Sequence, residues 1–115
     1  MRDDVRIWVR FGTVADAGPG EALLIEGQAL AAGPAVTRFV VPVRIGGHAV
    51  GCSCCTPRGP VATALGGLFL ARARGELPWF RSVVAVTHSA AGADAVRAAL
   101  DEDVVTRARF RVDTG

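Results

Sequence analysis

The three cysteines of this chain are its residues best suited to chemistry, because they lie within four positions of one another. Cys52, Cys54 and Cys55 are the only cysteines in the sequence. A cysteine that fills a core needs no cysteine neighbour, and a disulfide framework usually has an even count with wider spacing. A divalent cation between three close thiolates would remove their mutual repulsion. The spacing therefore favours a soft metal site, with thiol redox chemistry second and an inert cluster of small residues third.

The flanking residues predict that the cysteines lie in a turn between a strand and a helix. Residues 49–50 are typical of a strand end, and either Thr56-Pro57 or Gly59-Pro60 can begin a helix. The positive N-terminal end of that helix, together with Arg58, favours thiolates over thiols. We expect the helix to end near Gly75 and to carry an apolar stripe made of Val61, Ala64, Leu65, Leu68 and Phe69.

A histidine is the natural fourth ligand, because zinc prefers four ligands in a tetrahedron. His88 lies at the C-terminal end of a predicted buried strand, and the cysteines follow the end of another strand. The carboxyl ends of parallel strands share one edge of a sheet, so His88 is predicted to join Cys52, Cys54 and Cys55. The alternative is a solvent-facing loop histidine. His48 is expected to be a turn residue, since an extended segment places it roughly 13 Å from Cys52.

The hydrophobic pattern predicts one α/β domain over residues 1–115, with a small, mainly parallel sheet and flanking helices. Gly46-Gly47 predicts a single antiparallel hairpin, and residues 22–25 are ambiguous between a strand and a helical turn. Besides the helix that follows the cysteines, we expect a helix over 94–101. The expected strands, read from alternating or continuous apolar residues, are 5–11, 39–43, 82–86 and 107–112.

The Gly66-Gly67 pair lies inside the helix predicted after the cysteines. A glycine within a helix costs about 1 kcal/mol relative to alanine. The simplest explanation for the pair is close packing of the helix against the sheet.

The composition excludes several functions. All 13 basic residues are arginines, so the chain cannot supply the lysine of a Walker A loop. The net charge of +2 is small and dispersed, which argues against nucleic-acid binding. The longest apolar run, residues 61–71, is too short to cross a bilayer, so no membrane association is expected. The N-terminus lacks a secretory pattern, and reduced cysteines predict a cytoplasmic protein.

The stretch from Gly51 to about Asp113, rather more than half of the chain, resembles the CobW family of GTP-dependent metal chaperones. The main motif is Gly51-Cys52-Ser53-Cys54-Cys55-Thr56-x-Arg58, which is similar to that family's GCxCC-T-x-R signature. The resemblance implies a partial P-loop-NTPase-like domain with metal bound at the cysteines. Three further segments look similar in layout, at residues 61–68, 78–84 and 108–113.

The chain departs from that family wherever nucleotide chemistry is concerned. It has no Walker A loop, and the family's Asn-Lys-x-Asp guanine-reading motif cannot exist without lysine. Val86 falls where the family's Walker B strand ends in a glutamate, and His88 and Ser89 replace the small residue and glycine that follow. Neither the phosphates nor magnesium would be held in place, so no GTP or ATP hydrolysis is expected.

The sequence therefore predicts a CobW-like protein that binds zinc or another thiophilic divalent metal and handles, stores or transfers it without GTP hydrolysis. A thiol redox protein and a non-catalytic GTPase-like interaction subunit are the alternatives. The metal-receiving protein would be one partner. A second copy of the chain would be another, because half of the residues are hydrophobic and the missing N-terminal unit leaves a sheet edge and face to cover. The arginine-bearing strands at 5–11 and 107–112 are alternative means of blocking that edge.

Overall fold

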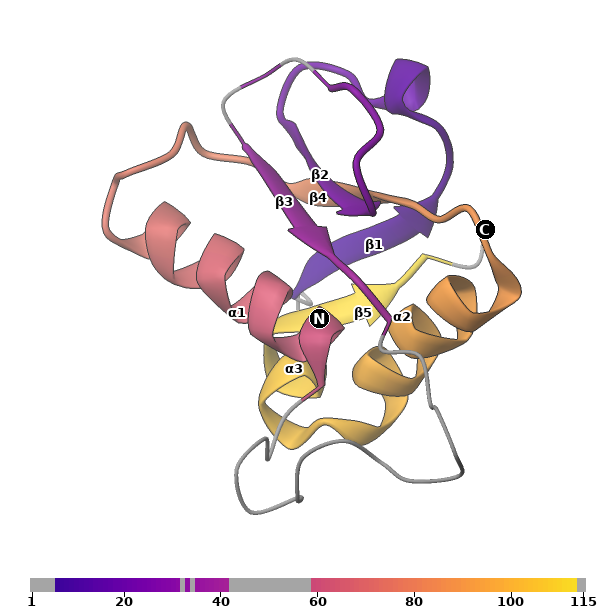
Figure 1. Ribbon diagram of the computed structural model, residues 1–115. Helices are drawn as coiled ribbons and strands as arrows, with labels where there is room; N and C mark the ends of the chain where they lie inside the picture. The colour runs from indigo at the N-terminus through magenta and orange to yellow at the C-terminus, as the bar shows by residue number, and fades with distance from the viewer. Residues whose placement is uncertain (1–5, 32, 34, 42–58, 114–115) are drawn as a thin grey trace.

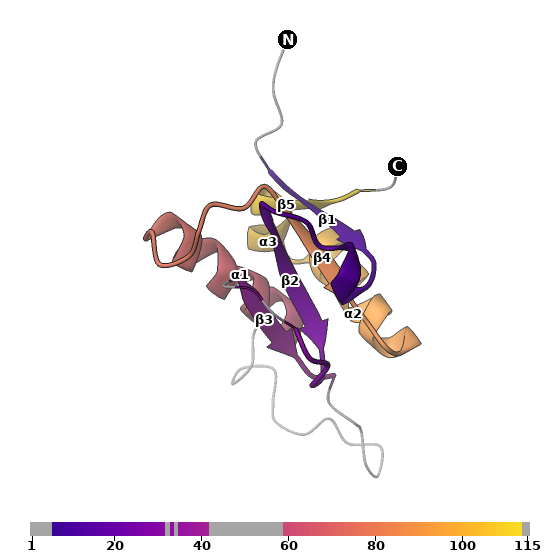
Figure 2. The ribbon, with the colours of Figure 1, turned by 90° about the horizontal axis from the view of Figure 1, so that it is seen from above.

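A five-stranded parallel sheet forms the centre of the protein in a computed structural model that describes residues 6–31, 33, 35–41 and 59–113. The order of the strands is β3-β2-β4-β1-β5, and Figure 2 shows β4 between β2 and β1. Every strand pairing is parallel, which confirms the predicted fold class. The hairpin predicted at Gly46-Gly47 lies outside the described residues. The strands are β1 (Ile7–Phe11), β2 (Glu21–Glu26), β3 (Val36–Phe39), β4 (Ser82–Val86) and β5 (Phe110–Val112).

The helices α1 (Pro60–Ala73), α2 (Ala90–Glu102) and α3 (Val104–Arg109) lie together on one side of the sheet (Figure 1). The main core lies between this helical layer and the sheet. Alternate residues of the strands point into it, as expected from the two-residue period of a strand. Its buried residues include Ile7 and Val9 from β1, Val83 and Ala85 from β4, Val61 and Leu65 from α1, and Val96 from α2.

The opposite face of the sheet is covered by a short connection rather than by an α-helix of the described ranges. Leu23, Ile25 and Val84 form a second buried cluster, and Val14 and Ala17 of the segment 12–20 pack on it. That segment contains the 3-10 helix η1 (Val14–Asp16). Because β2 and β4 carry apolar residues on both faces, both read as continuous hydrophobic runs. This resolves residues 22–25 as strand.

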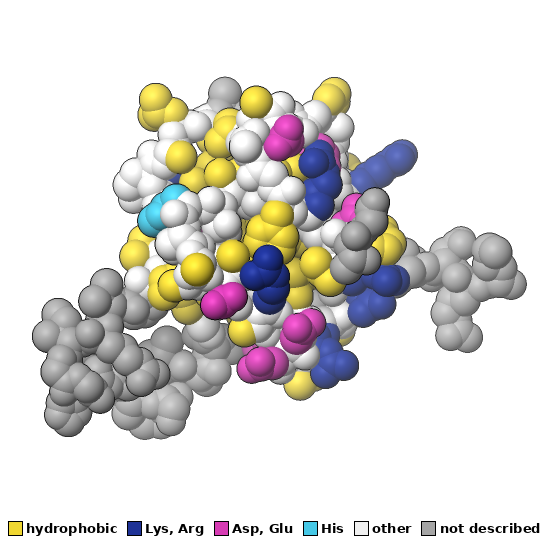
Figure 3. Space-filling view, turned by 90° about the vertical axis from the view of Figure 1, so that its right-hand side faces the viewer, with side chains coloured by type: hydrophobic (Ala, Val, Ile, Leu, Met, Phe, Trp, Pro, Cys, Tyr) yellow, Lys and Arg dark blue, Asp and Glu magenta, His cyan; other side chains and the backbone are white. Residues whose placement is uncertain are grey.

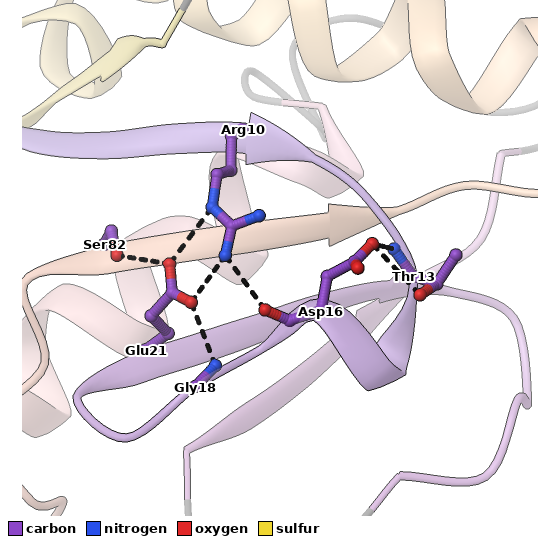
Figure 4. Close-up of polar contacts among 6 residues, drawn as sticks. All are labelled: Arg10, Thr13, Asp16, Gly18, Glu21 and Ser82. Carbon is purple, nitrogen blue, oxygen red and sulfur yellow. Dashed lines mark hydrogen bonds and ion pairs between the residues drawn. The ribbon is translucent and has the colours of Figure 1, made fainter.

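A salt bridge fixes the segment 12–20 to the second face of the sheet (Figure 4). Arg10 donates from Nη2 to Glu21 Oε1 at 2.6 Å and from Nε to Glu21 Oε2 at 3.2 Å. The same Nη2 donates to the carbonyl of Asp16 at 3.0 Å. Glu21 also accepts from the backbone N–H of Gly18 and from Ser82 Oγ, at 2.9 and 2.7 Å. One carboxylate therefore ties β1, β2, β4 and the connection together.

Three boundaries differ from the sequence prediction because of helix caps and strand position. The edge strand β3 ends at Phe39, where the predicted strand began. Ser89 Oγ accepts from the backbone N–H of Gly92 at 3.0 Å and starts α2 one turn before the predicted helix. Asp103 accepts from the backbone N–H and Oγ of Thr106, at 2.9 and 2.7 Å, so α3 replaces the first part of the strand predicted over 107–112.

Helix α1 begins at Pro60 with Gly59 as its N-cap, which confirms the second of the two predicted helix starts. Close packing does not explain Gly67. This residue is exposed, and a Cβ built on it would meet nothing within 4 Å. The explanation offered for the pair of glycines is therefore wrong at position 67.

The topology makes the end of β4 a switch point in the sheet. The connections that leave β1 and β2 lie on the second face, where Val14 and Ala31 pack, whereas β4 leads into α2 on the helical face. Because β4 lies between β1 and β2, the connection after β4 and the connections after its two neighbours lie on opposite faces of the sheet. Open α/β sheets bind ligands outside the carboxyl ends of strands at such a point.

The helices of the described ranges include none that is both long and apolar enough to cross a membrane.

Candidate functional site

A buried carboxylate and an exposed imidazole meet at this switch point. Strand β2 ends at Glu26, and β4 is followed by Thr87-His88-Ser89. Glu26 is 6% exposed. Its Oε1 accepts from the backbone N–H of His88 at 2.9 Å and of Ser89 at 3.2 Å, and its Oε2 accepts from Ser89 Oγ at 2.6 Å. Glu26 thus joins the end of β2 to the start of α2.

These hydrogen bonds keep Glu26 ionised despite its burial. Burial alone would raise the pKa of the Glu26 carboxyl, but the hydrogen bonds from Ser89 and His88 outweigh it and hold the pKa below its ordinary value of 4.5. The negative charge lies at the N-terminus of α2, where a helix carries partial positive charge. Glu26 therefore occupies the place where an external anion would otherwise meet this helix.

Gly92 is required by the same arrangement. It lies in the first turn of α2, and a Cβ at this position would overlap Glu26 Oε1 and lie 2.7 Å from Oε2. Even the smallest side chain would displace the carboxylate or the helix. The sequence therefore supplies a glycine where the helix passes closest to Glu26.

The side chain of His88 lies at the surface, directly beside this buried network. It is 69% exposed, and Nε2 lies 3.4 Å from Glu26 Oε2. The ring rests against Gly27, whose φ of +87° is a glycine conformation and whose Cβ, if present, would lie 3.3 Å from Nε2. Figure 3 shows histidine at the surface, next to hydrophobic and uncharged atoms. A carboxylate that contacts one nitrogen of a metal-binding histidine orients the ring and leaves the other nitrogen for the metal.

The structure leaves part of the predicted site undescribed. Cys52, Cys54 and Cys55 lie outside the described residues, as does His48. The chain leaves the described sheet after Val41, shortly beyond β3, and is described again from Gly59. Phe39 of β3 is in register with Glu26 of β2, so this departure is close to the edge that carries His88.

The described residues do not form a metal site by themselves. Among them, no group of three or more histidine, cysteine, aspartate or glutamate side chains is arranged to hold an ion. A metal site at this edge would therefore need donors from outside the described residues, and the cysteines of residues 42–58 are candidates. The chain covers roughly 3.3 Å per extended residue, so that segment is long enough to return a thiol to the edge.

Glu26 is the residue of this edge that the sequence analysis missed. The signal was present, because Glu26-Gly27 directly follows an apolar run, as His88 follows another. The ambiguity of residues 22–25 hid it. With those residues assigned to a parallel strand, Glu26 also lies at the carboxyl end of a strand. That position is where ligands bind in parallel sheets, and it was the reason for choosing His88.

A comparison of the chain with protein-family models, curated proteins and solved structures finds no match in any of the three.

Proposed function

We propose that this protein binds one thiophilic divalent metal ion, zinc by default, through Cys52, Cys54 and Cys55, with His88 as the fourth ligand. The observation that carries the proposal is the clustering of all three cysteines within four residues. Three thiolates and one imidazole form a common tetrahedral zinc set. The metal would be stored or handed to a recipient protein in the cytoplasm, without nucleotide hydrolysis.

The described part of the chain supports His88 as a ligand in two ways. Its imidazole is 69% exposed and therefore accessible to a donor segment. Glu26 holds one ring nitrogen near a carboxylate that is itself fixed by three hydrogen bonds. A ligand whose orientation is set in advance loses less entropy on binding.

The first experiment measures metal content per chain. Protein loaded with zinc under reducing conditions is dialysed and analysed by elemental mass spectrometry. The wild type should retain one zinc ion per chain, and the double variant Cys54→Ser, Cys55→Ser should lose it. Ser53→Ala, which removes a hydroxyl inside the same segment, is the matched control and should retain zinc. If the reduced wild type binds no metal, the proposal fails and thiol redox chemistry takes its place.

The second experiment tests His88 alone. His88→Ala should weaken zinc binding by more than about tenfold in a chelator competition, because the ion loses one of four ligands and loss of a group that only hydrogen-bonds to a ligand already costs about that much. Asp94→Ala is the matched control on an exposed site of α2 and should leave the affinity unchanged. Equal affinities for wild type and His88→Ala would remove this residue from the ligand set and leave a three-thiolate site.

A further inference from the structure

Strand β5 lies at one edge of the sheet, and it is the last strand of the described chain. Strand β5 pairs with β1 on one side only. On the helical face of the sheet, Val112 lines a surface cavity of about 190 Å³ together with Leu100, Arg97 and Asp101 of α2. No strand of the described residues pairs with the other flank of β5, so in this part of the chain the edge can receive another strand.

The backbone pattern identifies the residue that would pair across this edge. In a parallel ladder, alternate residues direct their N–H and C=O groups to the same neighbour. The N–H of Asp113 donates to the carbonyl of Val9 at 2.7 Å, so Asp113 and Arg111 face β1. Val112 therefore directs both backbone groups outward, away from β1.

We propose that this edge pairs with the same edge of a second copy, so that two β5 strands run antiparallel about a two-fold axis through Val112. In that register the two Val112 residues exchange both N–H···O=C bonds. The two five-stranded sheets become one continuous sheet, and the interface is the same patch on both copies.

Charge complementarity selects a second copy as the occupant. With Val112 opposite its symmetry mate, Arg111 of each copy lies directly opposite Asp113 of the other copy. Opposite charges in such cross-strand pairs stabilise a sheet, whereas like charges destabilise it. Edges that block association often carry charged side chains of one kind, especially lysine. The order Arg-Val-Asp carries both signs and complements itself when read antiparallel.

The cavity beside Val112 fits the same register. Residues directly opposite in an antiparallel pair place their side chains on the same face. Phe110 and Val112 pack on the helical core, so the valine of the second copy would also lie on the helical face. There it would meet the apolar part of the cavity, which Leu100 and Val112 line.

Analytical ultracentrifugation of reduced, metal-free protein tests the proposal separately from metal binding. The wild type should show a reversible monomer–dimer equilibrium. Arg111→Asp and Asp113→Arg should each weaken dimerisation by at least about tenfold, because two symmetric pairs become like-charged. The double variant Arg111→Asp, Asp113→Arg should regain the wild-type affinity. Failure of the double variant to regain it, or a wild type that stays monomeric up to millimolar concentration, overturns the proposal.

A backbone variant provides an independent measurement. Val112→Pro removes the outward N–H but none of the bonds to β1, so it should abolish the dimer while circular dichroism shows a folded monomer. Val112→Thr keeps the N–H and the branched shape, and it should dimerise. A folded Val112→Pro protein that still dimerises with wild-type affinity overturns the proposed register. If the proline variant unfolds, the charge series decides.

Discussion

Glu26 carries the polar network at the switch point, since one buried carboxylate accepts from two backbone N–H groups and one hydroxyl. A buried group of this kind stabilises the fold only while all its partners are present. Removal of the carboxylate would leave its three donors buried and unpaired.

Glu26→Gln should therefore destabilise the protein by about 1–3 kcal/mol, because the amide NH₂ faces donors where an oxygen accepted before. Urea unfolding followed by circular dichroism measures this. Glu102→Gln, on the exposed end of α2, is the matched control and should change stability by less than about 0.5 kcal/mol. Equal losses in the two variants would show that Glu26 is not a structural anchor.

At the scale of the elements, the helical glycines Gly67 and Gly92 can be compared, because they differ in what surrounds them. Gly67 of α1 faces open space, whereas Gly92 of α2 faces the carboxylate of Glu26. The same substitution should therefore have opposite signs at the two positions.

Gly67→Ala should stabilise the protein by up to about 1 kcal/mol, because alanine loses less backbone entropy in a helix. Gly92→Ala should destabilise it by about 1–3 kcal/mol or more, because its Cβ overlaps Glu26 Oε1. Urea midpoints of the two variants and the wild type measure both effects. Loss of stability at Gly67, or no loss at Gly92, would contradict the packing described for that helix.

The sequence predicts the buried strand β4 and helix α1 well, because their hydrophobic patterns are long and their start signals are strong. It predicts the starts of α2 and β5 poorly. Ser89 and Asp103 are ordinary N-cap residues, but each competes with an equally plausible pattern nearby. The alternation of Arg107, Arg109 and Arg111 with apolar residues resembles a strand, yet the Asp103 cap and packing on the core place its first half in α3. Helix caps together with tertiary packing decided these boundaries.

At the scale of the whole molecule, two acidic side chains hold separate parts of the fold while ionised. Burial alone would raise the pKa of Glu21, but hydrogen bonds from Arg10, Gly18 and Ser82 outweigh it and lower the pKa below its ordinary value of 4.5. The pKa of Glu26 is lowered in the same sense. Both groups bind protons more weakly in the folded chain than in the unfolded chain.

The stability that these two carboxylates contribute should therefore be fully present above about pH 4.5. It should be lost as the pH falls further, through the lowered pKa values of the folded state. Unfolding midpoints measured between neutral and acidic pH check the direction. The double variant Glu21→Gln, Glu26→Gln should be less stable at neutral pH and should lose less stability on acidification. A double variant with the acid sensitivity of the wild type would assign that sensitivity to other carboxyls.

The strand order β3-β2-β4-β1-β5 also determines when the chain can fold during its synthesis. Strand β1 is the first to leave the ribosome, yet its partners in the sheet are β4 and β5. Until Ser82 and the residues after it emerge, β1 has no neighbouring strand among the described elements, and only β2 and β3 can pair. Contacts between distant parts of a chain form slowly, because a long loop must close first. The apolar residues Ile7 and Val9 therefore have no partner strand among the described elements until β4 and β5 have been synthesised.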